Sequence, residues 1–328
     1  MSVLKKAKTL FAVTLTAFLS SFMAKASSEP LKIGYSDWPG WVAWEVAVEK
    51  DWFKKAGVDV KFEWFDYVAS MDAFAANQLD GVLMTNGDTL VTGSTGAASV
   101  MILAGDYSNG NDMVVAAPGI DSVKDLKGKK VGVEIGFVGH LILLNALEKA
   151  GMTESDVTLV NVPTNETPQV LASGDVDAIV AWQPNSGQAL KQVAGSKAIY
   201  SSADEPGLIY DVLAVSPSSL AAKRDDWSKV IDIWYKVVEY INNPKTQADA
   251  LSIMAARVGL SAEEYAPLLA GTKLLTREEA KEVFAKGDGF SSLYGSSKIS
   301  DDFNLKYDVY KTAQDLEAYI DGSLTLAK

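Results

Sequence analysis

The sequence predicts an α/β protein built from two similar lobes, and three observations point to this fold class. Short apolar segments with strand character alternate with amphipathic segments from Leu31 onward, which is typical of parallel α/β sheets. The same alternation begins a second time at Lys130. Two extended segments, residues 112–117 and 209–215, lie where the chain would pass from one lobe to the other and back.

The first run of elements is defined by its apolar spacing. We expect strands at residues 31–35, 58–65 and 81–84, separated by helices at residues 41–56 and 69–78. Because a helix separates each strand from the next, successive strands should run in the same direction. The first lobe is therefore expected to carry a parallel sheet.

The second run repeats this order. Strands are expected at residues 130–134, 157–162 and 178–182, with a helix at residues 139–150 and another before the last strand. Residues 74–82 (FAANQLDGV) and 170–179 (VLASGDVDAI) each end a helix, turn, and start an apolar strand with an Asp. The two segments indicate an internal repeat. The alternative is that helix–turn–strand junctions resemble one another by chance.

The remaining elements complete the two lobes. Residues 112–117 and 209–215 are the candidate hinges, so residues 27–116 with 213–328 form lobe 1 and residues 117–212 form lobe 2. Beyond Pro217, amphipathic helices that should pack on lobe 1 are expected at residues 227–243, 245–258, 262–269, 277–285 and 306–319.

The amino-terminal residues have the pattern of a secretory signal peptide. Residues 1–8 contain three lysines and no acid, and the apolar run at residues 9–22 is too short to span a membrane. The sequence AKA at residues 24–26 predicts cleavage near Ala26. Because no cysteine follows the run to accept a lipid, we expect an unlipidated protein of the periplasm.

Composition excludes several classes of function. The chain carries 42 acidic and 30 basic residues, a formal net charge of -12, and no cluster of Lys and Arg, so nucleic acid is not expected as a partner. With no cysteine and one histidine, the sequence predicts no metal site and no cofactor. We expect a monomer.

Four segments resemble a known family of transport proteins. They are LKIGY (31–35), EKDWFKKAGVDV (49–60), DLKGKKVGV (125–133) and DAIVAWQP (177–184), and they are similar to the periplasmic solute-binding proteins of nitrate, sulfonate, taurine and thiamine-precursor ABC importers. The resemblance covers roughly residues 30–220. It implies a two-lobed periplasmic binding protein (type II) that closes on a small solute by a hinge of crossing strands and docks on an inner-membrane ABC permease. Within that family, YSDWPGWVAWE (35–45) resembles the subgroup found with guanidine and urea-carboxylase systems.

The loops that follow the strands show what the site should bind. In open α/β sheets, ligands lie beyond the carboxyl ends of the strands. The corresponding loops here are residues 36–41, 85–88, 134–136, 182–184 and 210–211, and four of the five contain a carboxylate while none contains Lys or Arg. Because several carboxylates around one cleft repel an anion and are relieved by a cation, the loops predict a cationic ligand.

Tryptophan narrows the choice of cation. Five of the eight tryptophans lie between residues 38 and 64, and an indole face favours an organic cation over a hard metal ion. Guanidinium is flat, weakly hydrated and pairs with carboxylates through two N–H groups, so it is the favoured solute. The candidate ligand-binding residues are Asp37, Trp38, Trp41, Asp88, Glu134, Trp182 and Asp211.

Several of these residues also have structural explanations. Asp37 and Asp88 could cap helices, and Asp211 could cap at a hinge. Trp38 and Trp41 could pack in a core, Trp44 is expected to do so, and His140 is expected to be packed in the first turn of its helix.

An acid–base hydrolase and a binder of another solute are the alternatives to the binding of a cation. An acid–base hydrolase would need an acid with a raised pKa opposite a base, and the sequence marks no such pair, no dinucleotide loop and no nucleophile elbow, so an enzyme is not expected. The alternative within the same fold is a binder of a nitrate-, sulfonate- or taurine-type anion or of a thiamine-precursor pyrimidine.

Overall fold

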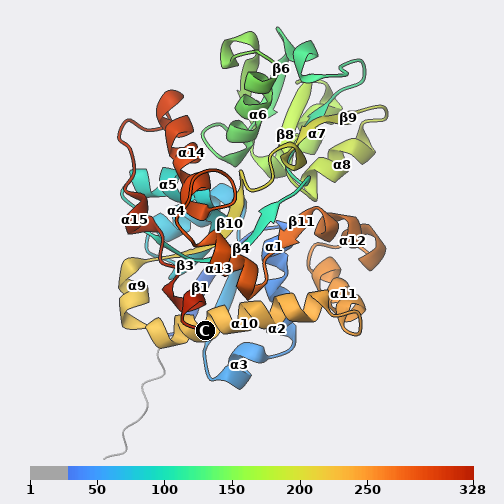
Figure 1. Ribbon diagram of the computed structural model, residues 1–328. Helices are drawn as coiled ribbons and strands as arrows, with labels where there is room; N and C mark the ends of the chain where they lie inside the picture. Colours follow the sequence, from blue (N-terminus) through green and yellow to red (C-terminus); the bar gives the residue numbers. More distant parts are fainter. Residues whose placement is uncertain (1–28) are drawn as a thin grey trace, which may run out of the picture.

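The computed structural model describes residues 29–328, which form two lobes (Figure 1). The predicted signal peptide, residues 1–26, and its cleavage site lie outside the described residues. Within residues 29–328 the strands form one six-stranded and one five-stranded sheet. We call the first sheet with its helices the first lobe, and the second sheet with its helices, green at the top of Figure 1, the second lobe.

The sheet of the first lobe has the order β11-β4-β10-β3-β1-β2. β1 pairs in parallel with β2 and β3, whereas β10 is antiparallel to β3 and β4, and β11 is antiparallel to β4. The central strands are apolar because helices cover both faces of the sheet. The strands are β1 (Leu31–Tyr35), β2 (Val60–Trp64), β3 (Gly81–Thr85), β4 (Val100–Ser108), β10 (Tyr210–Val215) and β11 (Thr272–Leu274).

The sheet of the second lobe has the order β7-β6-β8-β5-β9. β6 pairs in parallel with β7 and β8, and β5 runs antiparallel between β8 and β9. The strands are β5 (Met113–Ala116), β6 (Lys130–Val133), β7 (Thr158–Asn161), β8 (Ala178–Ala181) and β9 (Lys197–Ser201).

The two lobes share an equivalent arrangement, which confirms the predicted repeat. Asp80, before β3, accepts a hydrogen bond from the N–H of Lys32 on Oδ2 (3.0 Å) and donates its own N–H to the carbonyl of Lys32 (2.8 Å). Asp177, before β8, makes the same two bonds with Lys130, at 2.8 and 2.9 Å. Each Asp therefore fixes the start of its strand against the neighbouring strand of the sheet.

The crossings between the lobes lie a few residues away from the predicted hinges. β5 belongs to the second sheet and β10 to the first, so the chain crosses at residues 109–112 and 202–209. The predicted lobe limits at residues 116 and 212 thus fall at the end of β5 and inside β10. The two extended segments are not free connections, because each pairs on both sides within a sheet.

The helices that follow β10 pack on the first lobe, as predicted (Figure 1). α10 (Arg224–Asn242) is the longest of them, and its Trp234 ring lies 4.7 Å from the ring of Trp44. Trp44 is 1% exposed and has the core role expected for it. The aromatic contact joins α10 to the amino-terminal segment of the chain.

Two predicted helices were wrong. The helix expected at residues 41–56 is broken into three, α1 (Pro39–Val42), α2 (Trp44–Glu49) and α3 (Trp52–Ala56), with Asp51 at a φ of 56° between the last two. The helix expected at residues 306–319 does not form. α14 (Leu293–Lys306) ends there, Asp308 takes a φ of 60°, and only α15 (Leu316–Tyr319) follows. Left-handed residues interrupt a helix whatever its apolar spacing.

The other helices complete the layers around the two sheets. The α-helices are α4 (Tyr67–Ala75), α5 (Asn86–Ser94), α6 (Val138–Lys149), α7 (Thr167–Ser173), α8 (Asn185–Gln192), α9 (Pro217–Ala222), α11 (Gln247–Arg257), α12 (Ala262–Ala270), α13 (Arg277–Val283) and α16 (Ser323–Leu326). Short 3₁₀ helices are η1 (Val123–Leu126), η2 (Glu154–Asp156), η3 (Thr164–Glu166) and η4 (Ser202–Asp204). None of the helices in residues 29–328 has both the length and the apolar character to cross a membrane.

Candidate functional site

The loops singled out from the sequence meet where the two lobes face each other. The carboxyl ends of β1, β3, β6 and β8 point to this region, and the antiparallel strands β5 and β10 begin there. Two chambers lie between the lobes, and Tyr67 and Trp182 line both of them. These two rings, whose centroids are 5.1 Å apart and nearly perpendicular, form the wall between the chambers.

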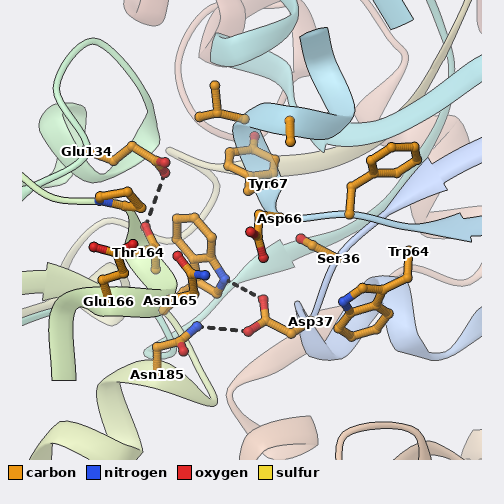
Figure 2. Close-up of a pocket in the computed structure, with 15 residues that line it drawn as sticks. Ser36, Asp37, Trp64, Asp66, Tyr67, Glu134, Thr164, Asn165, Glu166 and Asn185 are labelled. Atoms are coloured by element: carbon orange, nitrogen blue, oxygen red, sulfur yellow. Dashed lines mark hydrogen bonds between the residues drawn. The ribbon is translucent and has the colours of Figure 1, made fainter. Parts of the chain in front are cut away.

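The outer chamber has a volume of about 220 Å³ (Figure 2). The first lobe contributes residues that follow β1 and β2, and the second lobe contributes residues that follow β6, β7 and β8. Its carboxylates are those of Asp37, Asp66, Glu134 and Glu166. Its aromatic side chains are those of Trp64, Phe65, Tyr67 and Trp182.

Asp37 joins the lobes across the outer chamber. Its Oδ1 accepts a hydrogen bond from Trp182 Nε1 (3.2 Å), and its Oδ2 accepts one from Asn185 Nδ2 (2.8 Å) (Figure 2). Burial raises the pKa of Asp37, and these two bonds oppose the rise. Asp37 makes no capping bond to α1, so it connects the lobes rather than capping a helix.

Glu134 faces the outer chamber from the second lobe (Figure 2). Its Oε2 accepts a hydrogen bond from Thr164 Oγ1 at 3.2 Å. Burial, with repulsion from Asp88, Asp66 and Asp37 added to it, raises the pKa of Glu134 to about 7. A carboxyl group with this pKa gains from a nearby positive charge.

The inner chamber is much smaller, and every residue that lines it is buried. Its volume is about 10 Å³, room for roughly one water molecule. Trp41 stacks on Tyr67 with ring centroids 5.3 Å apart, and Trp38 lies beside Trp41 at 6.4 Å. The residues that line it are Trp38, Trp41, Tyr67, Thr85, Asp112, Val138, Trp182, Ile209 and Asp211.

Two aspartates of the inner chamber have an oxygen without a hydrogen-bond partner. Asp112 is 4% exposed and Asp211 is 3% exposed, and within residues 29–328 the Oδ2 atom of each is unpaired. Burial raises the pKa of Asp112 to about 7. Burial, reinforced by repulsion from Asp106 and Asp112, raises the pKa of Asp211 well above its ordinary value. The chamber therefore contains acceptors that lack a donor.

Asp106 supports the inner chamber from behind. It pairs across the sheet with Asp211, and its Oδ1 accepts a hydrogen bond from Trp38 Nε1 at 2.9 Å. Burial raises the pKa of Asp106 to about 7. Because the two carboxyl groups lie side by side on β4 and β10, they titrate as one coupled pair. Asp106 orients the Trp38 ring in the chamber wall.

The substitution Gly40→Ala is expected to lower stability by about 1–3 kcal/mol through overpacking. A Cβ at Gly40 would lie 2.1 Å from Asp106 Oδ2, so the carboxyl group would have to move away from Trp38. Urea unfolding followed by circular dichroism measures the loss. Gly132→Ala is the control, because its new Cβ would meet nothing closer than 3.4 Å. Equal midpoints for the two variants would contradict the prediction.

Asp88 lies next to the chambers without lining either of them. Its Oδ2 accepts hydrogen bonds from Tyr67 Oη (2.6 Å) and from the N–H of Val138 at the start of α6 (3.3 Å). Burial raises its pKa to about 6. The helix cap at α5 is the side chain of Thr85, so Asp88 holds Tyr67 in place and contacts the second lobe.

Among the residues that line the two chambers in the described part of the chain, none is Lys, Arg or His. One cationic side chain, that of Arg257, contacts Trp64, which lines the outer chamber. The Arg257 guanidinium lies 4.2 Å over the Trp64 ring, and its Nε donates to Tyr35 Oη (2.8 Å) and Glu45 Oε1 (3.1 Å). Arg257 is thus already paired with the carboxylate of Glu45.

The structure places six of the seven candidate residues around the chambers. Asp37 and Glu134 line the outer chamber, Trp38, Trp41 and Asp211 line the inner one, and Trp182 lines both. Asp88 acts through Tyr67 and Val138.

Sequence reasoning missed Tyr67, Asp66 and, above all, Asp112. A signal for Asp112 was present, because the two crossing strands have an acid at their starts, Asp112 just before β5 and Asp211 within β10. Asp66 and Tyr67 follow β2, whose loop is not among the five loops from which the candidate residues were predicted.

His140 is packed, as predicted. Its ring lies 6.4 Å from Phe303 in an edge-to-face contact, and burial lowers its pKa to about 4. Residues 29–328 contain no group of His, Asp and Glu side chains arranged to hold a metal ion.

Known proteins match this chain over most of its length. A family model described as NMT1/THI5 like matches residues 39–248. A putative binding protein of Brucella abortus is 31% identical over 201 residues, covering 61% of this chain and 62% of that protein. A putative aliphatic sulfonates-binding protein of Escherichia coli is 27% identical over 174 residues, covering 52% and 54%. The chain thus matches less than two thirds of the length of these relatives.

A solved structure matches the fold more completely. The periplasmic aliphatic sulphonate binding protein of Escherichia coli aligns with a TM-score of 0.72 at 19% identity, covering 92% of this chain and 100% of that chain. The predicted fold class, a two-lobed periplasmic binding protein, is confirmed by this likeness and by the two sheets.

Proposed function

Because the chain belongs to the NMT1/THI5-like family, we propose that it is the solute-binding component of an ABC importer and captures a small planar organic cation, guanidinium, between its lobes. The single observation that carries the choice of ligand is the lining of the two chambers. It combines carboxylates and aromatic rings and contains no Lys, Arg or His among the described residues.

The charge of the lining supports a cation. Asp37, Asp66, Glu134 and Glu166 share the outer chamber, and Asp112 and Asp211 share the inner one. Burial and mutual repulsion raise the pKa of Glu134 and of Asp211, which means that ionising these groups costs free energy. A bound cation offsets that cost because it attracts each carboxylate at short range.

The aromatic rings support an organic cation over a metal ion. Trp38, Trp41, Tyr67 and Trp182 surround the inner chamber, and a delocalised cation over an indole face gains about 0.5–2 kcal/mol. A hard metal ion requires a shell of six or more oxygens, which rings do not supply. Guanidinium combines a flat face for the rings with N–H groups for carboxylates.

A sulfonate or another anion is the second candidate, favoured by the name of the Escherichia coli relative. An anion in these chambers would meet carboxylates from both lobes and no cationic side chain among the lining residues. Helix amino ends can bind anions, but the N–H of Val138 at the start of α6 already donates to Asp88. The lining therefore favours a cation over a sulfonate.

The remaining parts of the proposal follow from the family and the fold. We assign the protein to the periplasm, where it would deliver its solute to an inner-membrane permease. Its role is binding without catalysis, and closure of the two lobes would surround the solute.

Guanidinium, supplied at millimolar concentration, is expected to raise the melting temperature of the protein, because a ligand that binds only the folded state stabilises it. A thermal-shift panel of guanidinium, methylguanidine, urea, choline, agmatine, nitrate, taurine and an aminopyrimidine checks this, with sodium chloride at matched ionic strength as the control. Stabilisation by taurine or nitrate with no response to any cation would contradict the proposal. Stabilisation by the aminopyrimidine alone would select the thiamine-precursor alternative.

A further inference from the structure

We propose that the inner chamber holds the cation, with Asp112 and Asp211 as its two carboxylate partners, and that the outer chamber is the route by which the cation enters. This inference rests on the proposed function, since it names the position and the selectivity of the same solute. Two observations carry it: unpaired acceptors and aromatic walls.

The acceptors of the two chambers differ in their access to donors. In the outer chamber, both oxygens of Asp37 accept hydrogen bonds, Glu134 accepts one from Thr164, and Asp66 and Glu166 are exposed to water. In the inner chamber, Ser108 and Asp106 interact with the carboxyl groups of Asp112 and Asp211, but both acids are more than nine-tenths buried, and the Oδ2 atom of each is unpaired within the described residues. A buried acceptor without a donor costs roughly 1–3 kcal/mol, and more when it is charged. A ligand with several N–H donors removes that cost in the inner chamber and gains less in the outer one.

The walls of the inner chamber suit a flat cation. The stacked pair Trp41 and Tyr67 forms one side, and Trp38 is fixed beside it by its hydrogen bond to Asp106. Because the Asp106 bond sets the position of Trp38, that wall is preformed before any ligand arrives. Preformed walls reduce the conformational entropy lost on binding.

An unpaired donor on Trp41 makes urea an informative ligand to compare with guanidinium. Its Nε1 is a buried donor with no partner in the described part of the chain. Urea has nearly the shape of guanidinium and carries a carbonyl that could accept from this N–H, but it has no charge. If hydrogen-bond donors and molecular shape decided the affinity, urea would bind as tightly as guanidinium. The carboxylate pair predicts instead that guanidinium, which is charged, binds more tightly than urea.

The chamber is small, and its size depends on both lobes. It measures about 10 Å³, while Val138 and Trp182, two of its walls, belong to the second lobe. Guanidinium has four heavy atoms and needs more room than this, so the inference requires the lobes to separate before the ion enters. A methyl or alkyl substituent has to displace the Tyr67 and Trp182 wall, which closes the way to the outer chamber. The inner chamber is therefore selective for the unsubstituted ion.

The test is isothermal calorimetry with guanidinium chloride at pH 8 on the whole protein and five variants. Asp112→Asn and Asp211→Asn keep the shape of each side chain but remove its charge, and each is expected to weaken binding by more than 100-fold. Asp37→Asn and Glu134→Gln, in the outer chamber, are expected to weaken it by less than tenfold. The control is Asp59→Asn, which should leave the affinity unchanged because Asp59 is exposed and lies at the amino end of β2, whereas the site lies at the carboxyl ends of the strands.

The outcomes separate this inference from the proposed function. If Asp37→Asn and Glu134→Gln weaken guanidinium binding more than Asp112→Asn and Asp211→Asn do, the cation lies in the outer chamber. The inference is then overturned, while the proposed function stands. If guanidinium does not bind the unaltered protein at all, the proposed function itself fails.

A second measurement needs no variant. The inner chamber predicts that methylguanidine and urea each bind the unaltered protein at least tenfold more weakly than guanidinium. Equal or tighter binding of methylguanidine would overturn the predicted enclosure, and tighter binding of urea would overturn the role of the carboxylate pair.

Discussion

Guanidinium is expected to bind about 100-fold more weakly at pH 5 than at pH 8. The ion keeps its charge over this range, so the change must come from the protein. Burial raises the pKa of Asp112, Asp106 and Glu134 to about 7 and that of Asp88 to about 6. Below pH 7 these groups take up protons that a cation has to displace. The 100-fold figure corresponds to one displaced proton, that of Asp112, which lowers the affinity tenfold for each pH unit below its pKa of about 7.

The sign of this effect follows from the acids in and beside the two chambers. Asp106 on β4 and Asp88 on α5 lie beside them, and the acids that line them are Asp112 ahead of β5, Asp211 on β10, Asp37, Asp66, Glu134 and Glu166. The lining residues include no Lys, Arg or His that could lose a proton as the pH rises. Affinity should therefore rise with pH and level off above the raised pKa values.

Calorimetry at pH 5, 6, 7 and 8, in two buffers with different heats of ionisation, measures the affinity and the number of protons released. Asp59→Asn should follow the same curve as the unaltered protein, because its carboxylate is exposed. An affinity that stays constant from pH 8 to pH 5, with no proton released, would show that the raised pKa groups do not meet the ligand.

The substitution Tyr67→Phe is expected to destabilise the protein by about 2–4 kcal/mol at pH 8. The hydroxyl group donates to Asp88 Oδ2 at 2.6 Å and accepts the N–H of Thr85 at 3.0 Å, and all three residues are buried. Phenylalanine keeps the ring but leaves the N–H of Thr85 without its partner and removes the hydroxyl donor of Asp88. Leaving buried groups unpaired costs roughly 1–3 kcal/mol each, and the cost rises when one of them is charged.

The cost of Tyr67→Phe should also depend on pH. The hydroxyl group opposes the rise that burial causes in the pKa of Asp88, so removing it raises that pKa above about 6. The ionised form of Asp88 is the one that loses stabilisation, so the destabilisation should be larger at pH 8 than at pH 5. Urea unfolding at both pH values measures the difference.

Tyr265→Phe is the matched control for this prediction. Tyr265 is equally buried, but its hydroxyl makes one hydrogen bond to a neutral group, the carbonyl of Pro39 at 3.1 Å. Its loss should cost about 1 kcal/mol. Equal costs for the two variants, unchanged between pH 8 and pH 5, would mean that Asp88 gains nothing from Tyr67 as an ionised group.

The contacts between the lobes connect ligand capture with closure. Asp37 of the first lobe binds Trp182 and Asn185 of the second, and Asp88 accepts the N–H of Val138. Asp37 and Asp88 both repel the carboxylate of Glu134, and a bound cation would offset this repulsion. In the proposed function, the cation therefore favours the closed arrangement, because it stabilises the same carboxylates that hold the lobes together.

The sequence by itself determined the architecture and the chemical character of the cleft. Apolar spacing located the parallel strands of both lobes, and the segments around Asp80 and Asp177 predicted two equivalent halves. Because strands of a parallel sheet end at one edge, the loops after β1 and β6 could be assigned to the cleft, which brought in Asp37 and Glu134. These inferences depend on local patterns, which a linear sequence contains in full.

Only the tertiary structure decided which of these side chains share a chamber. Asp106 and Asp211 lie about 100 residues apart in the chain and become neighbours because β4 pairs with β10. Asp112 joins them because the chain crosses to the second lobe there, just before β5 of the other sheet. Asp37 could have capped a helix by its position in the sequence, and its bonds to Trp182 and Asn185 exist because the lobes meet there. The physical reason is that spacing along the chain predicts single elements, whereas the partners of a buried carboxylate depend on strand pairing and lobe contact between distant segments.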